Sequence, residues 1–316
     1  MPILDLKAAL ELGKISEGTV LVNVPPSIRQ GRRDDFMVGQ FMNQQQNVEF
    51  KIWEERIFAT IRDNGVGMYD VKVEGSEYNG SYLTVLEARP TQDTSLGESD
   101  FLPAVDRERL NSLWRDALDK LGRDGLSEKA VLLIRDLIGA EELGGRFTVE
   151  GAAIRHHDNL IGGLAWHTTK MLNILAAVME NNVELRGDID MLTVGIVVHD
   201  IGKVYEYNNL GPGEYWYANH RVRGIEFLAD HRDRIIADFG ETFYRQIQSI
   251  ISGHHGEYGD RPQTVAAAIV HYIDTLESQV TGLIQSQQQS NDERTRFSDW
   301  GFLMGLPNLP DPDDKG

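Results

Sequence analysis

Short apolar segments separated by turn residues occupy the first third of the chain. One of them is a β-branched run that ends at two prolines, and another alternates between apolar and polar side chains. The pair Asn79-Gly80 lies between two of these segments and is typical of a tight β-hairpin. The segments are residues 18–24, 36–41, 48–53, 68–73 and 82–86. This pattern predicts a small barrel or sandwich of short strands.

The hydrophobic period changes from two to about 3.6 residues after a polar, turn-rich stretch at residues 91–100. Beyond this stretch the apolar positions recur at helical spacing, so an all-α region is expected. The expected helical segments are residues 110–121, 130–138, 164–179, 191–199, 246–251 and 265–276. From residue 285 the chain becomes polar, and three prolines in residues 305–316 predict an irregular end.

Composition narrows the classes of protein that the chain can belong to. Of its 316 residues 41% are hydrophobic, which is enough for a substantial core. A formal charge of −18 argues against a broad basic face for nucleic acid but leaves room for a local basic groove. The absence of cysteine excludes disulfides, thiolate metal sites and cysteine nucleophiles. No stretch has the pattern of a signal peptide or a membrane span, so we expect a soluble cytoplasmic protein.

All nine histidines lie after residue 155, in the part of the chain that is predicted to be helical. His199-Asp200 ends an apolar helix, and Asp274 lies inside another helix that is otherwise too apolar for a carboxylate. Burying a carboxylate is costly unless it is paired or binds a metal. A mixture of imidazoles and carboxylates suits Mn²⁺, Fe²⁺ or Mg²⁺. An aspartate that bridges two ions about 3.5–4 Å apart would let them activate a water for attack on phosphorus.

The ordered histidines and aspartates resemble the HD superfamily of metal-dependent phosphohydrolases, whose usual central motif is the HDIGK found at residues 199–203. The series is His167, His199-Asp200, His220, His254-His255 and Asp274. The resemblance implies one ion held by His167, His199, Asp200 and Asp274. It also implies that Asp200 bridges to a second ion held by His220, His254 and His255. Lys203 would meet a phosphate oxygen or donate to a metal-bound water.

Simpler interpretations exist for some of these residues. His220 follows a loop, where a surface histidine is ordinary, and either His254 or His255 could support the site without binding metal. Lys203 could neutralise the C-terminus of a helix. His231 is expected to be solvated. His271 is expected to pack in the core or to support a metal ligand.

Longer segments resemble one group within this superfamily, the YhaM-type 3′→5′ exoribonucleases. The segments are RHHDNLIGGLAWHT at 155–168, VVHDIGKV at 197–204, ISGHHGE at 251–257 and HYIDTLES at 271–278. Those enzymes carry an OB-fold nucleic-acid-binding domain ahead of the HD domain, in agreement with the β-rich first third. The chain departs from the family at Asn219, where glycine is usual, and at Asp158-Asn159, where an aromatic residue is commoner. By the resemblance His156 and His157 face the substrate phosphate, with a structural role as the alternative.

An OB barrel holds single strands by stacking bases on aromatic side chains and by placing cations along the backbone. Most aromatic residues of the barrel will belong to its core, because alternate residues of a barrel strand point inward. The candidates are Phe36, Phe41, Phe50, Trp53, Tyr69, Tyr78 and Tyr82, and of these Trp53 is assigned to substrate binding. A local basic cluster is formed by Arg29, Arg32 and Arg33. The alternative interpretation of this basic cluster is a solvated loop whose positive charge is offset by Asp34-Asp35.

These features predict an α+β multidomain fold, with a small N-terminal β-barrel (OB-fold) followed by an all-α HD domain. The expected boundaries are 1–92 for the OB-fold domain, 93–150 for a linker and connecting helices, 151–284 for the HD domain and 285–316 for a polar tail.

The expected function is a metal-dependent 3′→5′ exoribonuclease. It would act on single-stranded RNA through a metal-activated water and release nucleoside 5′-monophosphates, with single-stranded DNA left open as a substrate. Two divalent ions are expected, with manganese favoured over iron, cobalt and magnesium. No membrane partner is expected, and a homo-oligomer is left open. The alternatives are an HD hydrolase of small nucleotides and a non-catalytic single-strand-binding factor.

Overall fold

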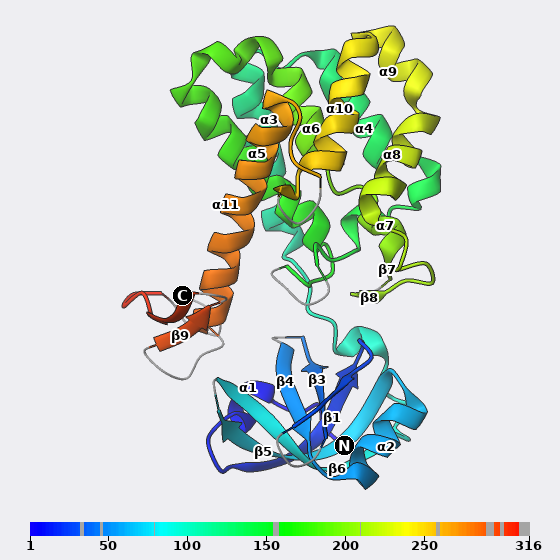
Figure 1. Cartoon of the computed structure of the whole chain (residues 1–316), viewed down its shortest axis with the longest axis vertical. Helices are drawn as coiled ribbons and strands as arrows, with labels where there is room; N and C mark the ends of the chain where they lie inside the picture. The colour runs from blue at the N-terminus through cyan, green and yellow to red at the C-terminus, as the bar shows by residue number, and fades with distance from the viewer. Residues whose placement is uncertain are drawn as a thin grey trace. The chain divides into compact units, whose positions relative to one another are not determined.

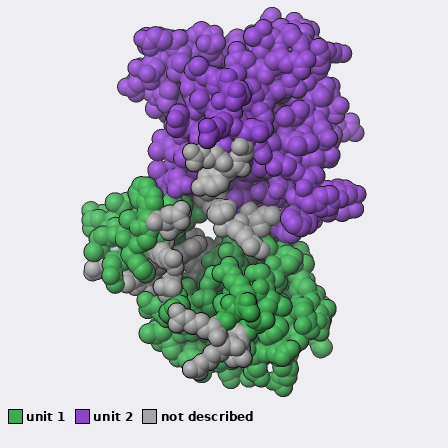
Figure 2. Space-filling model, viewed as in Figure 1, with its two compact units in different colours: residues 1–103, 282–316 green, residues 104–281 purple. Residues whose placement is uncertain are grey.

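The computed structural model of the chain describes residues 1–31, 35–44, 47–78, 80–153, 158–208, 210–256, 260–288, 294–297 and 300–309. The chain divides into two compact units, which Figure 2 shows in different colours. One unit contains Met1–Pro103 together with Gly282–Gly316, and the other contains Ala104–Thr281. We refer to them as the barrel unit and the helical unit. Among the described residues no helix is long and apolar enough to cross a membrane.

The barrel unit is built from a sheet whose hydrogen bonding closes on itself. Its strands are β1 (Ile15–Val22), β2 (Ser27–Arg29), β3 (Phe36–Met42), β4 (Asn47–Ile52), β5 (Gly67–Glu77) and β6 (Ser81–Pro90). Their order is β1-β5-β6-β4-β3, and pairing of β1 with β3 at Leu21 and Met42 completes the circuit. All neighbours in this circuit are antiparallel except β4 and β6, and β2 adds to the edge of β3. This closed Greek-key barrel confirms the predicted OB-like fold.

The barrel core explains the apolar alternation along its strands. Phe41 on β3 and Phe50 on β4 are fully buried, and their rings stack with centroids 4.1 Å apart. Gly39 is needed beside them, because a Cβ at this position would lie 2.5 Å from the Phe50 ring. The predicted hairpin joins β5 to β6, with Glu77 opposite Ser81. Asn79 itself lies outside the described residues.

Two helices of the barrel unit were not predicted from the sequence. α1 (Leu6–Ala9) is a single turn, and α2 (Glu55–Asn64) follows β4 in the sequence and lies beside β6, as Figure 1 shows. The α2 helix buries Ile57, Phe58 and Ile61 and exposes most of its other residues. Three apolar residues within a short charged segment gave a weak periodic signal next to strong strand patterns.

The helical unit packs around one continuous apolar core. Its α-helices are α3 (Arg107–Arg123), α4 (Glu128–Ile138), α5 (Gly163–Asn181), α6 (Ile189–Val198), α7 (Lys203–Glu206), α8 (His220–Asp230), α9 (Arg232–Phe239), α10 (Glu241–Gly253) and α11 (Val265–Gln288). The last of these continues beyond the helical unit, which ends at Thr281. Short 3₁₀ turns (Glu98–Asp100, Glu141–Leu143, Arg146–Thr148 and Val183–Asp188) and the strands β7 (Tyr207–Asn208) and β8 (Gly211–Pro212) connect helices or precede them. The helices α3 and α4 lie within Ala104–Thr281, the range of this unit.

After α11 the chain forms a small antiparallel hairpin of β9 (Arg294–Phe297) and β10 (Gly301–Met304). The sequence indicated only a polar tail in this region, because strands of four residues leave little periodic pattern.

Candidate metal centre

The α6 helix is buried along almost its whole length and ends at His199 and Asp200. Apolar residues on every side fix the position of this helix, so its C-terminal end delivers both polar side chains into the interior. Gly202 lets the next turn pass close to the start of α8, because a Cβ there would lie 1.8 Å from the carbonyl oxygen of His220. The glycine of the HDIGK segment therefore has a packing role beside the cluster.

Other helices bring further polar side chains to the same place. His167 comes from the second turn of α5, His220 is the first residue of α8, and His254 ends α10. Asp274 comes from α11. We call the set of His167, His199, Asp200, His220, His254, His255 and Asp274 the HD cluster. The structure brings all seven side chains close together.

Asp200 lies at the centre of the HD cluster, and its two oxygens face different histidines. Oδ2 is 3.2 Å from His199 Nε2 and 3.9 Å from His167 Nε2. Oδ1 is 3.3 Å from His254 Nε2 and 3.5 Å from His220 Nε2. A carboxylate in this position can contribute one oxygen to each of two adjacent sites.

Two groups of donor atoms within the HD cluster share Asp200. His167, His199 and Asp200 form one group, and the other is formed by Asp200, His220, His254 and His255. Asp274 joins the first side, with Oδ1 at 3.2 Å from His167 Nε2. In each group the donor atoms lie within 4.8 Å of one another, so each could surround one ion.

Four histidines of the HD cluster have partners at Nδ1, so that their Nε2 atoms point inward. His199 Nδ1 lies 2.6 Å from the Ile196 carbonyl oxygen, and His254 Nδ1 lies 2.9 Å from the Ile251 carbonyl oxygen. Glu277 contacts Nδ1 of His167, and Glu206 Oε2 lies 2.8 Å from Nδ1 of His220. A hydrogen bond from Nδ1–H leaves the Nε2 lone pair free to bind a metal.

Several buried atoms of the HD cluster have no hydrogen-bond partner among the described residues. They are Asp200 Oδ1, His199 Nε2 and His254 Nε2. Leaving buried polar atoms unpaired is costly, and these three point into the same space. A divalent cation would satisfy them, so the donor set fits a metal.

Charges around the HD cluster shift its pKa values in ways that suit a cation. Burial alone would raise the pKa of Asp200, but Lys203 and His199 hold it well below its usual range. Burial and the neighbouring His254 lower the pKa of His255 to about 3, which keeps that imidazole neutral. Burial opposes protonation of His167, yet Asp274 and Glu277 outweigh it and raise the pKa to about 10. A cation would displace this proton, because ligands bind metal in their deprotonated form.

The Lys203 side chain is 11% exposed and contacts both Asp200 and the backbone of Ala152. Its Nζ lies 2.6 Å from Asp200 Oδ2 and donates at 2.5 Å to the carbonyl oxygen of Ala152. Burial disfavours the ammonium form, but the Asp200 carboxylate raises the pKa of Lys203 above its ordinary value. The residue therefore fixes the orientation of the central carboxylate.

The remaining predicted residues lie elsewhere or outside the described part of the chain. His156, His157, Arg32 and Arg33 are outside the described residues. His231 pairs with Glu142 at 2.8 Å, and His271 Nδ1 lies 2.6 Å from the carbonyl oxygen of His254. His271 thus supports the backbone that carries a cluster histidine.

Arg29 and Trp53 lie on the outer surface of the barrel unit, and both are next to Phe36. Trp53 is 49% exposed, and its ring stacks on Phe36 with centroids 4.5 Å apart. Arg29 on β2 is the cross-strand partner of Phe36 on β3, so both side chains leave the same face. Lys51 lies 3.6 Å from the centre of the Tyr82 ring. Aromatic and cationic side chains are thus combined on strands β2, β3, β4 and β6.

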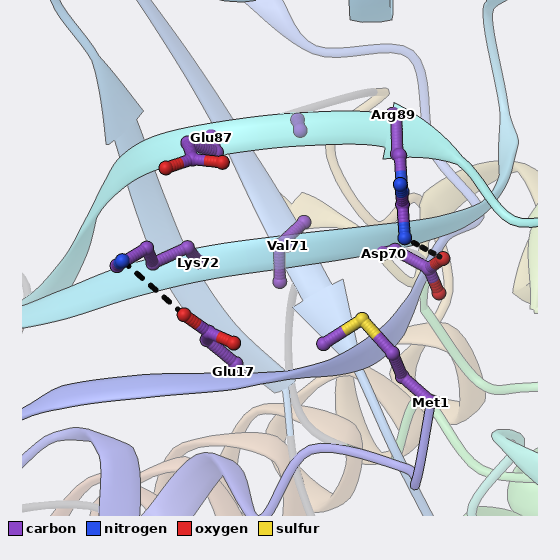
Figure 3. A pocket seen from close by; sticks show the side chains of 8 residues that line it. Met1, Glu17, Asp70, Val71, Lys72, Glu87 and Arg89 are labelled. Atoms are coloured by element: carbon purple, nitrogen blue, oxygen red, sulfur yellow. Dashed lines mark ion pairs between the residues drawn. The ribbon is translucent and has the colours of Figure 1, made fainter.

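Another face of the barrel carries a depression of about 240 Å³ lined by residues of β1, β5 and β6 (Figure 3). Its cations are already paired: Lys72 lies 3.2 Å from Glu17, and Arg89 lies 3.4 Å from Asp70. Paired charges of both signs do not favour an anionic ligand such as a phosphate chain.

Sequence reasoning missed Glu277 and Glu206, the two carboxylates that hold cluster histidines. Glu277 follows Asp274 by three residues, so both lie on one face of α11. This spacing was a usable signal, because a second carboxylate in an apolar helix also needs a partner. Glu206 gave no comparable signal, since it lies in a segment of mixed polarity after Lys203.

Comparison with known proteins agrees with this geometry. The HD domain family matches residues 164–279, a range that contains the whole HD cluster. Together with the site this defines an HD-domain protein of the class of metal-dependent hydrolases. Within that class the chain is similar to YhaM-type proteins.

Two relatives show this similarity. The chain is 25% identical over 257 residues to the 3′-5′ exoribonuclease YhaM of Bacillus licheniformis, covering 78% of this chain and 79% of the relative. It is 24% identical over 258 residues to the protein of the same name from Bacillus subtilis (strain 168), with the same coverage. No solved structure matches the chain.

Proposed function

We propose that the protein is a metal-dependent 3′→5′ exoribonuclease that acts on single-stranded RNA and releases nucleoside 5′-monophosphates. The observation that carries this proposal is the central position of Asp200, whose two oxygens face two separate groups of histidines. The relatives named 3′-5′ exoribonuclease support the substrate class and the direction of degradation. Single-stranded DNA is a further candidate substrate for the same chemistry.

In this proposal the HD cluster holds two divalent ions. His167, His199, Asp200 and Asp274 take one ion, and Asp200, His220, His254 and His255 take the other. Manganese is the expected metal, because imidazole and carboxylate ligands together suit it. Such ions would stabilise charge on the phosphodiester and activate a water for hydrolysis.

The protein side chains supply orientation around these ions. Asp200 is the shared ligand, and Lys203 keeps it ionised and in place through a contact of 2.6 Å. The same ammonium lies close enough to the HD cluster to meet a phosphate oxygen once substrate is bound. We assign His156 and His157 to the substrate phosphate on the basis of the family resemblance.

The barrel unit is proposed to hold the RNA strand. Trp53 is expected to offer a stacking surface beside Phe36, and Arg29, Arg32 and Arg33 are expected to contact the phosphate backbone. The exposure of Trp53 and the adjoining Lys51 and Tyr82 support this role. The HD domain would then act on the 3′ end of a strand that the barrel retains.

The test is a time course with 5′-labelled single-stranded RNA and Mn²⁺, run with the wild type and with Asp200→Ala. The matched control is Asp233→Ala, because the Asp233 side chain is 99% exposed on α9 and its nearest cation, Arg232, is 3.5 Å away. We expect the wild type and the control to give a ladder that shortens from the 3′ end, and the Asp200 variant to bind RNA without cutting it.

Other outcomes of this time course would change the assignment. Binding without cleavage by the wild type would indicate a single-strand-binding factor. If the wild type neither bound nor cleaved RNA, small nucleotides would become the substrates to test.

A further inference from the structure

The four best-defined histidines of the HD cluster are held in two different ways. His199 and His254 direct Nδ1 to carbonyl oxygens three residues earlier in their own helices. His167 and His220 instead direct Nδ1 to carboxylates, those of Glu277 and Glu206. One carboxylate-held histidine belongs to each of the two donor groups that share Asp200.

Glu277 is part of a buried chain of charges. Its side chain is only 2% exposed; Oε2 contacts His167, and Oε1 contacts the Lys170 ammonium. Thr281 donates to Oε1 at 2.6 Å and accepts from Lys170 at 2.8 Å. Lys170 in turn lies 2.7 Å from Asp158 Oδ2. Every oxygen of Glu277 is therefore engaged, which fixes the ring of His167.

Asp158 anchors the far end of this chain of charges. It is 1% exposed and adopts φ = 57°, a left-handed backbone conformation that is uncommon for residues other than glycine. Its carbonyl oxygen accepts a hydrogen bond from Ala152 N at 3.1 Å. Asp158, His167 and Glu277 lie close enough to hold a cation of their own, but the Lys170 ammonium already contacts both carboxylates.

Glu206 has the equivalent place beside His220. It is the last residue of α7, the turn that follows the His199-Asp200 pair, and its Oε2 lies 2.8 Å from His220 Nδ1. Its backbone oxygen accepts from Gly213 N at 2.8 Å, which fixes the segment on which it lies. The carboxylate thus ties the first residue of α8 to the turn after α6.

We propose that Glu277 and Glu206 are positioning residues, each of which fixes and strengthens one histidine ligand in a different one of the two metal sites. This inference rests on the metal binding in the proposed function. A carboxylate that accepts the Nδ1 proton sets the tautomer and makes Nε2 a better donor. The backbone carbonyls that hold His199 and His254 carry no net charge, so they increase the donor strength of Nε2 less than a carboxylate does.

The experiment is a titration of metal-free protein with Mn²⁺, in which electron paramagnetic resonance reports the free ion. The variants are Glu277→Gln, Glu206→Gln and the double substitution, because glutamine keeps the shape and removes the charge. The control is Glu226→Gln on α8, a surface carboxylate that pairs with Arg223 at 2.9 Å. Thermal unfolding of each metal-free variant reports its folding separately.

We expect each single variant to weaken one of two binding steps by about ten- to a hundredfold, and the double variant to weaken both. The control should bind both ions as the wild type does. The inference would be overturned if Glu277→Gln and Glu206→Gln bound both ions within about twofold of the control. It would also be overturned if both single variants weakened the same step.

Glu277→Gln removes one of the two carboxylates that neutralise the Lys170 ammonium. The loss of this ion pair alone would lower the stability of the variant. Lys170→Met combined with Glu277→Gln and Asp158→Asn removes this ammonium together with both of its carboxylate partners, and the triple variant should show the same weakening of one step. Normal binding of both ions by this triple variant would refute the role of Glu277. If the wild type itself bound no Mn²⁺, the proposed function would fail, and that result is distinct from equal binding by wild type and variants.

Discussion

The two units of the molecule bury different kinds of side chain. Among the described residues the buried polar groups of the barrel unit are uncharged, at Thr19, Asn43 and Thr295. The helical unit buries a series of ionisable groups: Glu150, Asp158, His167, His199, Asp200, His220, His254 and Glu277. Buried charge is costly without compensation, so its concentration in one unit marks where the chemistry lies.

The barrel places its candidate binding groups on its outer surface instead. Phe41 and Phe50 fill the interior, whereas Phe36 and Trp53 stack on the outside. A surface site can change without loss of the fold, but the HD cluster is part of the interior that the helices pack around. The two units should therefore respond differently to substitutions and to metal removal.

The largest expected effect is on the stability of the barrel. Phe50→Ala should destabilise it by about 3–5 kcal/mol, because it removes a fully buried ring and leaves a cavity beside Phe41. Denaturant unfolding, monitored by hydrogen exchange of the backbone amides in β3 and β4, measures this loss of stability. Mn²⁺ binding should remain unchanged, and its loss in a folded variant would contradict the separation of roles.

Metal removal should act on the helical unit. At a metal concentration of about 100 to 1,000 times the dissociation constant, binding contributes roughly 3–4 kcal/mol of stability, which chelation would remove. Hydrogen exchange should then increase in α6 and α8, while the barrel strands keep their protection. Equal loss of protection in both units would argue that the ions are not bound by the HD cluster.

Trp53→Ala should weaken binding of single-stranded RNA by about 1–3 kcal/mol, the usual contribution of one stacked base. Hydrolysis of a saturating substrate should persist, because the substitution leaves the HD cluster intact. Fluorescence anisotropy measures the binding. Both proteins carry Asp200→Ala in this experiment, so that the RNA is not cleaved. Tyr78→Ala, which removes another exposed aromatic residue of the barrel, gives a comparison.

The smallest expected effect is on the pH dependence of the metal-free protein. The raised pKa of His167, about 10 against an ordinary 6.5, means that its protonated form stabilises the fold. That contribution is fully present below about pH 6.5 and is lost as the pH rises towards 10. The metal-free wild type should therefore lose at least about 1 kcal/mol over this range, the equivalent of roughly one pKa unit.

Glu277→Gln should flatten this dependence, because it removes one of the two carboxylates that raise the pKa of His167. Urea unfolding at pH 6.5 and pH 10 compares the two proteins. An equal slope in wild type and variant would show that Glu277 does not hold the His167 proton.

Much of the fold was visible in the sequence, because it depends on local patterns. Strands in the first third and helices after residue 100 followed from the period of apolar residues, and the histidine and aspartate series identified the HD cluster. α2 was missed because its apolar face consists of only Ile57, Phe58 and Ile61. The partnership of Glu277 with His167 joins residues 110 positions apart, and no local pattern reports such a pairing.

The most direct test of the account is the metal content of the protein after loading with Mn²⁺ and removal of the excess. We predict two ions per chain in the wild type and a large loss of both in Asp200→Ala, because both donor groups share that carboxylate. Asp233→Ala should retain the wild-type content. A wild-type chain that retained no ion, or an Asp200 variant that retained two, would contradict the central claim.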